Sequence, residues 1–473
     1  MAYNDDRDDW MDEGLQELID MYERMVAENS HQYFDHSNLE HILEYYLECF
    51  DFDKAVQLIA LALDLFPQSA YFKLKNIEIS YEQGSLVFSQ ALLQIDQLIE
   101  EIPYDTELYF VKLEFLLNES HSQMAIDTTD IALQYADEEE RLELYLLRAE
   151  AYQQMEEYRR AYASLEDALR IEPNYNDALE QYEFMLEETD WNDEGNIDFL
   201  TEYLIQNDKN ARAWLILGNI YKAQQNYPAA LHAFYQAADL TENWAMPCAC
   251  IGDTYFDQQD YEKALYWYLQ VMYNQGPDAE ILHIIGVCHF NLNHFIKAQY
   301  YFKRATQQDA NHAEAWFRLG VAEFELKQNE KALAAFKRTL QLNDNNREVI
   351  FALAMLNNLM ERPAEAIKYC LQYLQQDPQN KKIWLLLSCI YFEEAYYEEA
   401  VTVILRALEF FGDDAEINYM GFCYLHYQGL NAQAQALLEK ALQIDPSQYE
   451  MIYKILPNLH FHSEIQKLIN TYL

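Results

Sequence analysis

The chain has 473 residues, with 80 acidic and 32 basic side chains and a formal net charge of −48 at pH 7. A polyanion repels phosphate groups, so this charge argues against nucleic acid or an anionic membrane as a direct partner. A hydrophobic content of 51% excludes a disordered acidic chain, and only 11 Gly and 10 Pro leave little room for turn-rich β-structure. The composition therefore favours an all-α fold.

The N-terminal segment, residues 1–35, has neither the basic start nor the apolar run of a secretory signal. Apolar residues at helical spacing predict an amphipathic helix over residues 10–29. No apolar stretch approaches the ~20 residues that span a bilayer, so we expect a cytoplasmic protein without membrane insertion. Seven cysteines are an odd number for a disulfide framework, and we expect all of them to be small buried side chains.

Small residues recur at a nearly constant interval along the rest of the chain. Successive gaps are 36, 34, 36, 34 and 35 residues, and then six gaps of 34 follow. A period of this length predicts a solenoid, because each supersecondary unit can bury its apolar face only against its neighbours. The recurring residues are Ala55, Ala91, Ala125, Ala161, Gly195, Ala230, Ala264, Ala298, Ala332, Ala366, Ala400 and Ala434.

The most regular repeat begins at Ala211, which we number position 1. Positions 4, 7, 8, 11, 20, 24 and 27 are Trp214, Leu217, Gly218, Tyr221, Ala230, Phe234 and Ala237. This pattern resembles the tetratricopeptide repeat of bacterial-type multi-repeat proteins, a 34-residue unit of two helices, A and B. The resemblance implies an all-α, right-handed superhelical solenoid of about twelve repeats. The small residues at positions 8 and 20 would let helices A and B approach closely.

Four segments follow from this register. An acidic N-terminal segment with a capping helix covers residues 1–35, and divergent acidic repeats 1 to 5 cover 36–210. Consensus-like repeats 6 to 12 cover 211–447, and C-terminal capping helices cover 448–473. Residues 1–210 hold 12 basic and 50 acidic side chains, whereas residues 211–473 hold 20 and 30.

In this family, helix A positions 2, 5, 9 and 12 line a concave groove, and the resemblance carries this property to the present chain. The acidic set of groove positions includes Glu107, Glu114, Glu143, Glu150 and Glu180. The largely apolar set is Leu215, Asn219, Phe256, His283, Val287, Phe290, Phe317, Val321, Phe324, Phe351, Met355, Leu385 and Phe392. Alternatively, the acidity serves general solubility, the aromatic residues follow the family consensus at position 12, and His283 is a surface histidine without a role.

The chain has no glycine-rich phosphate loop, no metalloprotease motif and no nucleophile elbow. We therefore expect no catalytic residue, no cofactor and no metal site. Residues 190–202 resemble the start of a calcium-binding loop, but Thr201 stands where a bidentate Glu is required. Since this run coincides with the turn of the fifth repeat, ordinary helix capping by Asp and Asn is the alternative.

Some members of this family hold a partner's C-terminal carboxylate with basic residues and Asn at positions 5 and 9. Only Asn219 fits that arrangement here, so a carboxylate clamp is not expected. The predicted function is a non-enzymatic scaffold or adaptor that binds a peptide or helix of a partner protein, with basic and apolar segments, in the groove. Two alternatives are a structural protein that self-assembles through its terminal helices and a regulator that binds a small ligand.

Overall fold

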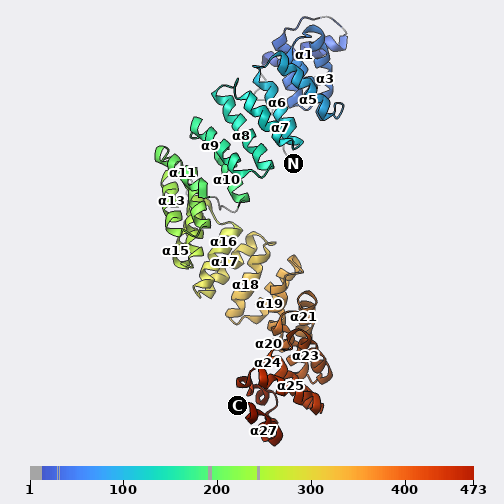
Figure 1. Cartoon of the computed structure of the whole chain (residues 1–473), viewed down its shortest axis with the longest axis vertical. Helices are drawn as coiled ribbons and strands as arrows, with labels where there is room; N and C mark the ends of the chain where they lie inside the picture. The colour runs from blue at the N-terminus through green and yellow to red at the C-terminus, as the bar shows by residue number, and fades with distance from the viewer. Residues whose placement is uncertain (1–12, 29, 31, 190–193, 242–244) are drawn as a thin grey trace. The chain divides into compact units, whose positions relative to one another are not determined.

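The computed structural model describes residues 13–28, 30, 32–189, 194–241 and 245–473 (Figure 1). Over these ranges the secondary structure consists of helices, without any strand. The contacts within the chain divide it into an N-terminal unit, Met1–Ala233, and a C-terminal unit, Phe234–Leu473.

The N-terminal unit begins with one helix that precedes the repeats and continues with six A/B helix pairs. Its last helix, α13, extends into the C-terminal unit. The helices are α1 (Glu13–Glu28), α2 (His36–Glu48), α3 (Phe52–Leu65), α4 (Ala70–Glu82), α5 (Phe88–Glu101), α6 (Thr106–Asn118), α7 (Ser122–Ala132), α8 (Glu138–Gln154), α9 (Tyr158–Ile171), α10 (Asn176–Glu188), α11 (Glu194–Gln206), α12 (Ala211–Ala223) and α13 (Tyr227–Leu240).

The C-terminal unit continues with six more A/B pairs, α14 to α25, and ends in short helices. Its elements are α14 (Ala245–Asp257), α15 (Tyr261–Gln275), α16 (Ala279–Asn291), α17 (Phe295–Gln308), α18 (Ala313–Glu325), α19 (Asn329–Leu342), α20 (Arg347–Leu359), α21 (Pro363–Gln376), α22 (Lys381–Glu393), α23 (Tyr397–Phe411), α24 (Ala415–Tyr427), α25 (Asn431–Ile444), η1 (Pro446–Gln448), α26 (Met451–Ile455), η2 (Pro457–Phe461) and α27 (Ser463–Tyr472). The helices from α2 to α25 thus form twelve pairs in the described residues, which confirms the predicted all-α solenoid of about twelve repeats.

The turn between helices A and B has the same backbone geometry in repeat after repeat. In repeat 7 the Gln259 amide donates to the Phe256 carbonyl at 2.8 Å, and the Asp260 amide donates to the Tyr255 carbonyl at 2.9 Å. These two bonds form a Schellman motif, which requires a left-handed residue. From Gln225 onward the left-handed residues of this A/B turn are spaced by 34: Gln225, Gln259, Asn293, Lys327, Glu361, Ala395 and Gly429. The backbone therefore confirms the predicted period independently of the side chains.

The small residues at position 20 lie where helices A and B meet, and eleven of the twelve are alanines that are at most 1% exposed. Repeat 5 differs from the prediction. Gly195 is exposed, whereas Asn196 is 3% exposed and its side-chain oxygen accepts a hydrogen bond of 2.8 Å from the Tyr182 hydroxyl. Helix α11 also ends ten residues after Asn196, as most B helices do after their position-20 alanine. The residue at position 20 of repeat 5 is therefore Asn196.

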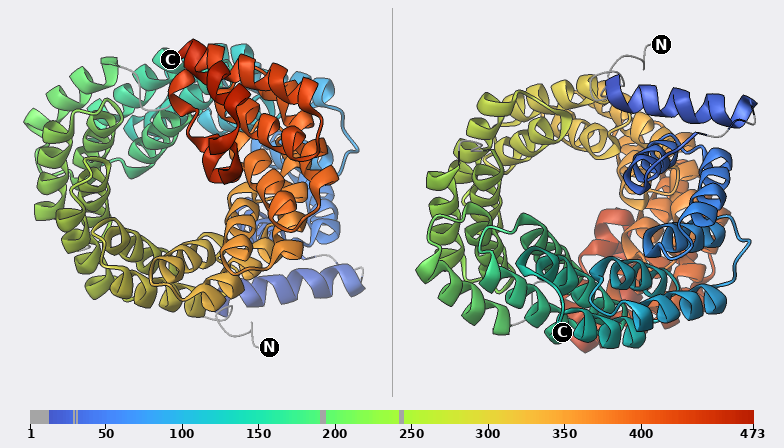
Figure 2. Two further views of the ribbon diagram at one scale, coloured as in Figure 1. Left: turned by 90° about the horizontal axis from the view of Figure 1, so that it is seen from below. Right: turned by 90° about the horizontal axis from the view of Figure 1, so that it is seen from above.

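Within each unit the helices stand in two layers, as Figure 2 shows. In the C-terminal unit, α16 contacts α18 and α20 contacts α22 in addition to their B partners. Consecutive A helices thus touch one another, and the layer that they form lies on the inner side of the curve of the stack.

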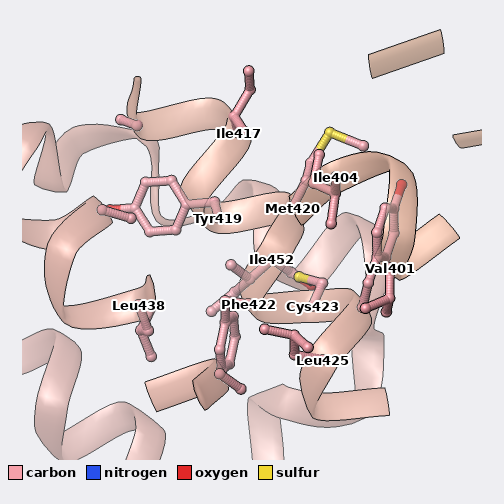
Figure 3. Close-up of a cluster of buried hydrophobic side chains, with 14 of the residues drawn as sticks. Val401, Ile404, Ile417, Tyr419, Met420, Phe422, Cys423, Leu425, Leu438 and Ile452 are labelled. Atoms are coloured by element: carbon pink, nitrogen blue, oxygen red, sulfur yellow. The ribbon is translucent and has the colours of Figure 1, made fainter. Parts of the chain in front are cut away.

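The last repeat carries a large buried cluster, drawn in Figure 3. Helix α24 is buried on nearly all sides, and its Tyr419 and Cys423 have no exposed surface. Ile452 of α26 belongs to the same cluster. The segment after the repeats therefore folds back onto the A helix of repeat 12.

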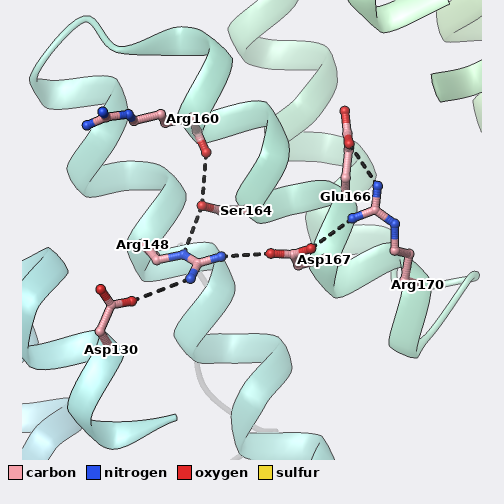
Figure 4. A network of polar contacts seen from close by, with 7 residues as sticks. All are labelled: Asp130, Arg148, Arg160, Ser164, Glu166, Asp167 and Arg170. Atoms are coloured by element: carbon pink, nitrogen blue, oxygen red, sulfur yellow. Dashed lines mark hydrogen bonds and ion pairs between the residues drawn. The ribbon is translucent and has the colours of Figure 1, made fainter. Parts of the chain in front are cut away.

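Repeat 4 replaces a core side chain by a charged one (Figure 4). Arg148 stands at position 7, where Leu217 stands in repeat 6. Its guanidinium lies 2.9 Å from Asp167 and 3.5 Å from Asp130, and its Nε donates to the Ser164 hydroxyl at 3.0 Å. A polar network thus joins α7, α8 and α9 at a position where repeats 6 to 11 have Leu or Ile.

The two terminal helices bury the apolar stripes that predicted them. Ile19 and Tyr22 of α1 are buried, as are Ile465 and Ile469 of α27, which packs on α25. We infer that these helices act as caps. The predicted start of the first helix, residues 10–12, lies outside the described residues.

Two further sequence expectations concern exposure and membranes. Four of the seven free cysteines are buried, but Cys250 and Cys389 are partly exposed and Cys49 is exposed at the end of α2, so the prediction that all seven are buried is wrong. No helix in the described part of the chain is long and apolar enough to cross a bilayer.

Candidate functional site

The predicted inner face of the C-terminal unit comprises positions 2, 5, 9 and 12 of α14, α16, α18, α20 and α22. On α18 these positions include Phe317, Val321 and Phe324, which follow one another at spacings of four and three residues and are half-buried. This spacing aligns the three side chains in one stripe along the helix. All three pack against the same buried core cluster as Phe351 of the next A helix.

The aromatic residues at position 12 also have a structural contact within their own repeat. Three of them pack edge-on against the aromatic residue five positions later, at the start of helix B, with ring centroids 5.3 Å apart, whereas Phe324 is followed at that place by Asn329. The pairs are Phe256 with Tyr261, Phe290 with Phe295, and Phe392 with Tyr397. Consensus packing therefore accounts for part of the predicted aromatic stripe.

The remaining members of the apolar set vary in exposure. Met355 on α20 is 45% exposed, and Val287 on α16 and Leu385 on α22 are half-buried. Leu215 and Asn219 lie on α12, which belongs to the N-terminal unit. The structure thus brings most of the set, but not these two residues, onto the A helices of the C-terminal unit.

The acidic set lies on α6, α8 and α10 of the N-terminal unit. Glu180 forms an ion pair of 2.7 Å with Arg212, and Glu107 lies 3.6 Å from Lys75. No basic side chain in the described residues lies within ion-pair distance of Glu114 or Glu143. The last member of the set, Glu150, is half-buried, and this burial raises the pKa of its carboxyl group. Part of the acidic set is therefore neutralised within the fold, and part is free to attract a cation.

The inner face of repeat 12 is covered by the chain itself. Tyr419 and Cys423 stand at positions 5 and 9 of α24, and both are completely buried. The Tyr419 hydroxyl donates to the Asp445 carbonyl at 2.9 Å, and α26 packs on α24 with Ile452 beside Cys423. In the C-terminal unit, the part of the predicted inner face that this segment leaves uncovered lies before α24.

Sequence reasoning singled out His283 without its neighbours. The structure places the His283 ring 5.0 Å from the His312 ring, and Glu280 contacts His312. Glu280 lies three residues before His283, and His312 lies 29 residues after it, just before α18. His312 stands at the N-cap of α18, where the A helices of the neighbouring repeats have Asp278 or Asn346. This unusual capping residue is the sequence signal that could have revealed the group.

The calcium-loop hypothesis is weakened by local structure. Residues 190–193 of the candidate loop lie outside the described residues. From Glu194 onward the segment is the helix α11, and the Asn196 side chain bonds inward to Tyr182. A helix cannot wrap its consecutive residues around one cation as a calcium loop does, so this part of the run supports the alternative of an ordinary helix start.

Three surface pockets recur at the same repeat positions, on the side of the A helices opposite the inner face. Each is lined by the position-4 tryptophan, Trp214, Trp316 or Trp384, and by helices B of two neighbouring repeats. The largest of these three has a volume of about 570 Å³. At about 100° per residue, position 4 points about 200° away from position 2, and position 7 points about 200° away from position 5. These pockets therefore do not belong to the predicted groove.

Solved structures similar to this chain include several helical repeat proteins. The anaphase-promoting complex hetero-tetramer Cut9–Hcn1 has 13% identity and a TM-score of 0.37, covering 82% of this chain and 89% of that chain. PilF of Pseudomonas aeruginosa has 15% identity and a TM-score of 0.37, covering 54% and 99%. MamA has 19% identity and a TM-score of 0.33, covering 35% and 97%. In the comparison with curated proteins, no sequence matches.

Stacked A/B pairs with a shared core define the class of α-helical solenoid proteins. Models of the tetratricopeptide repeat match residues 142–175 and 199–246. The model of anaphase-promoting complex subunit 3 matches residues 257–339, and that of the cytochrome c-type biogenesis protein H TPR domain matches 303–418. The chain is therefore a multi-repeat member of the tetratricopeptide-repeat family, which confirms the resemblance found in its sequence.

Proposed function

We propose that this protein is a non-enzymatic scaffold that binds an apolar segment of a partner protein on the inner face of its C-terminal unit. The observation that carries this proposal is the packing of α26 on α24. There, a short helix already lies on the inner face of one repeat and buries Ile452 against it.

The same inner positions in the preceding repeats have the chemistry to receive such a segment. Repeat 9 has Phe317 and Val321 at positions 5 and 9, and repeat 11 has Leu385 at position 5. These side chains are half-buried, so part of their apolar surface still faces water. A helix laid against them would remove that surface from water, and each buried anchor would contribute to affinity.

The acidic N-terminal unit adds an electrostatic preference to the proposal. Residues 1–210 hold 50 acidic and 12 basic side chains, and Glu114 and Glu143 are inner-face carboxylates without a nearby cation in the described residues. Such carboxylates attract a basic segment and accelerate the encounter more than they tighten the final complex. The partner that fits both units is a protein with one basic and one apolar segment.

The test of the apolar half uses full-length protein as bait in extracts of the native organism, with mass spectrometry of the captured proteins. The double variant Phe317→Ala, Phe324→Ala should lose the specific partner, and with a purified partner its dissociation should be at least tenfold faster. The matched control is Tyr266→Ala, Tyr300→Ala, which removes two exposed aromatic side chains from B helices. A partner that both variants retain equally would refute binding on the inner face.

The electrostatic half is tested by association kinetics with the same purified partner. Association should slow strongly between 50 and 300 mM salt, because salt screens the attraction between exposed charges. Glu114→Gln, Glu143→Gln should weaken this salt dependence without changing the dissociation rate. An association rate that does not respond to salt would exclude the steering role of the acidic unit.

A further inference from the structure

Three potential metal ligands converge where repeat 8 meets repeat 9. Glu280 and His283 lie one turn apart on α16, and His312 precedes α18. The Glu280 carboxylate lies 3.1 Å from His312 Nε2 and 3.7 Å from His283 Nδ1. One ligand atom from each residue lies within 4.8 Å of the other two. All three residues belong to the C-terminal unit.

His283 has an unusual environment for a polar side chain. Only 12% of it is exposed, and neither of its ring nitrogens has a hydrogen-bond partner. Buried polar atoms are nearly always paired, so two unpaired ring nitrogens call for a ligand.

His312 occupies a position that other repeats fill with a different kind of residue. It is the N-cap of α18, and its Nδ1 accepts a hydrogen bond of 3.3 Å from the Ala315 amide. The corresponding caps of α20 and α22 are Asn346 and Asn380. Asn is a better cap than His, but only His presents a second ring nitrogen, Nε2, toward Glu280.

We propose that Glu280, His283 and His312 form a Zn²⁺ site at the edge of the inner face. Two imidazoles and one carboxylate are a donor set that zinc takes, with a fourth position left open to water or another ligand. Hard cations such as Mg²⁺ and Ca²⁺ prefer all-oxygen sites.

The geometry requires only a small closure. Ligand atoms around tetrahedral zinc are separated by about 3.3 Å, given bond lengths of about 2.0–2.1 Å. The carboxylate oxygens of Glu280 already lie 3.1 Å from His312 Nε2 and 3.7 Å from His283 Nδ1, close to this separation, and all ligand atoms lie within 4.8 Å of one another.

Zinc binding has a specific consequence at His312. Because Nδ1 accepts the Ala315 amide, the neutral ring carries its proton on Nε2, which is the nitrogen that faces Glu280. Zinc at Nε2 therefore requires the proton to move to Nδ1, and the Ala315 amide then loses its acceptor. Hydrogen exchange in the first turn of α18 should accelerate when zinc binds.

The test is a calorimetric titration of the full chain with ZnSO₄ after removal of metals by EDTA, in 5 mM MgCl₂ to occupy carboxylates on the acidic surface. One saturable site is expected. Glu280→Gln and His312→Asn should each weaken it at least tenfold, and His312→Asn keeps a good helix cap so that folding is preserved. Co²⁺ in place of Zn²⁺ should give the visible absorption of a tetrahedral site.

The matched control is His294→Gln, which removes an exposed histidine whose ring lies 5.8 Å from that of His289 in the same unit. It should leave zinc affinity unchanged. The proposal is overturned if wild type shows no saturable zinc binding, if Glu280→Gln and His312→Asn bind as wild type does, or if exchange at the start of α18 does not respond to zinc.

Discussion

The ring of Phe302 lies directly against the backbone of Gly286. A Cβ atom on Gly286 would stand 2.6 Å from two of the ring carbons, closer than side chains approach one another. Phe302 is fully buried at position 24 of the same repeat, 16 residues after this glycine. The distance between α16 and α17 is therefore set by the absence of a side chain at position 8.

Gly286→Ala should destabilise the C-terminal unit by about 1–3 kcal/mol, because the added methyl group forces the Phe302 ring or the helix pair to move. Chemical denaturation followed by circular dichroism measures this effect. The variant Gly286→Ala, Phe302→Leu should lose less stability relative to Phe302→Leu alone, since the smaller side chain leaves room for the methyl group. Equal costs in both backgrounds would show that the ring does not determine the helix spacing.

At the left-handed residue of the A/B turn, we expect the opposite effect: replacing a residue by glycine should stabilise the protein. Ala395 has φ 62°, a conformation that costs a residue with a Cβ atom about 1 kcal/mol, and Gly429 occupies the same place in repeat 12. Ala395→Gly should therefore raise the stability by roughly 0.5–1 kcal/mol in thermal melts. The control Ala334→Gly, at an exposed position within α19, should lower it by about 1 kcal/mol. If both glycine variants changed the stability in the same direction, the left-handed conformation of Ala395 would be contradicted.

The features that repeat could be predicted from the sequence, because twelve copies of one constraint reinforce each other. Ala264 and Ala298 gave the register, and both are completely buried. Features that occur once could not be predicted in this way. Asn196 replaces the small residue of repeat 5 one position later than the predicted Gly195, and a single substitution of this kind has no periodicity to reveal it.

The candidate site shows the same distinction. The inner-face stripe of Phe317, Val321 and Phe324 follows from the family register and helical spacing. The cover on repeat 12 does not, because Ile452 reaches α24 through a segment that lies outside the repeats. The contact between Glu280 and His312 also joins two repeats across a single boundary, and the sequence offers no second copy of it.

His289 gives a prediction about pH. It is buried on α16, its ring stacks on Tyr301 at 5.4 Å, and burial lowers its pKa to about 4, with Lys297 and His294 acting in the same direction. In the unfolded chain His289 therefore takes up a proton near pH 6.5, whereas in the folded chain it takes one up only near pH 4. This residue's contribution to stability is present above about pH 6.5 and is lost as the pH falls toward 4.

His289→Tyr removes this titration while keeping a side chain that the repeat accepts, since Tyr255 and Tyr391 occupy the same position 11. Relative to wild type, the variant should gain stability steadily between pH 7 and pH 5 in parallel denaturation series. His41→Gln, at an exposed position on α2 far from His289 in the sequence, should show no such gain. A constant difference between His289→Tyr and wild type over this range would mean that folding does not lower the pKa of His289.

The network around Arg148 leads to a prediction about what its charges contribute. Asp130 and Asp167 are 61% and 39% exposed, so both carboxylates stay hydrated if the arginine is removed. Arg148→Leu restores the usual apolar residue of position 7 and should leave stability unchanged or raise it by about 1–2 kcal/mol, since exchanging a largely buried ion pair for apolar packing is often neutral or favourable. Arg148→Ala also loses the packing of the aliphatic stem and should cost about 1–3 kcal/mol. Thermal melts at low and high salt measure both variants against wild type. If Arg148→Leu proves as damaging as Arg148→Ala, the ion pairs themselves hold α7, α8 and α9 together.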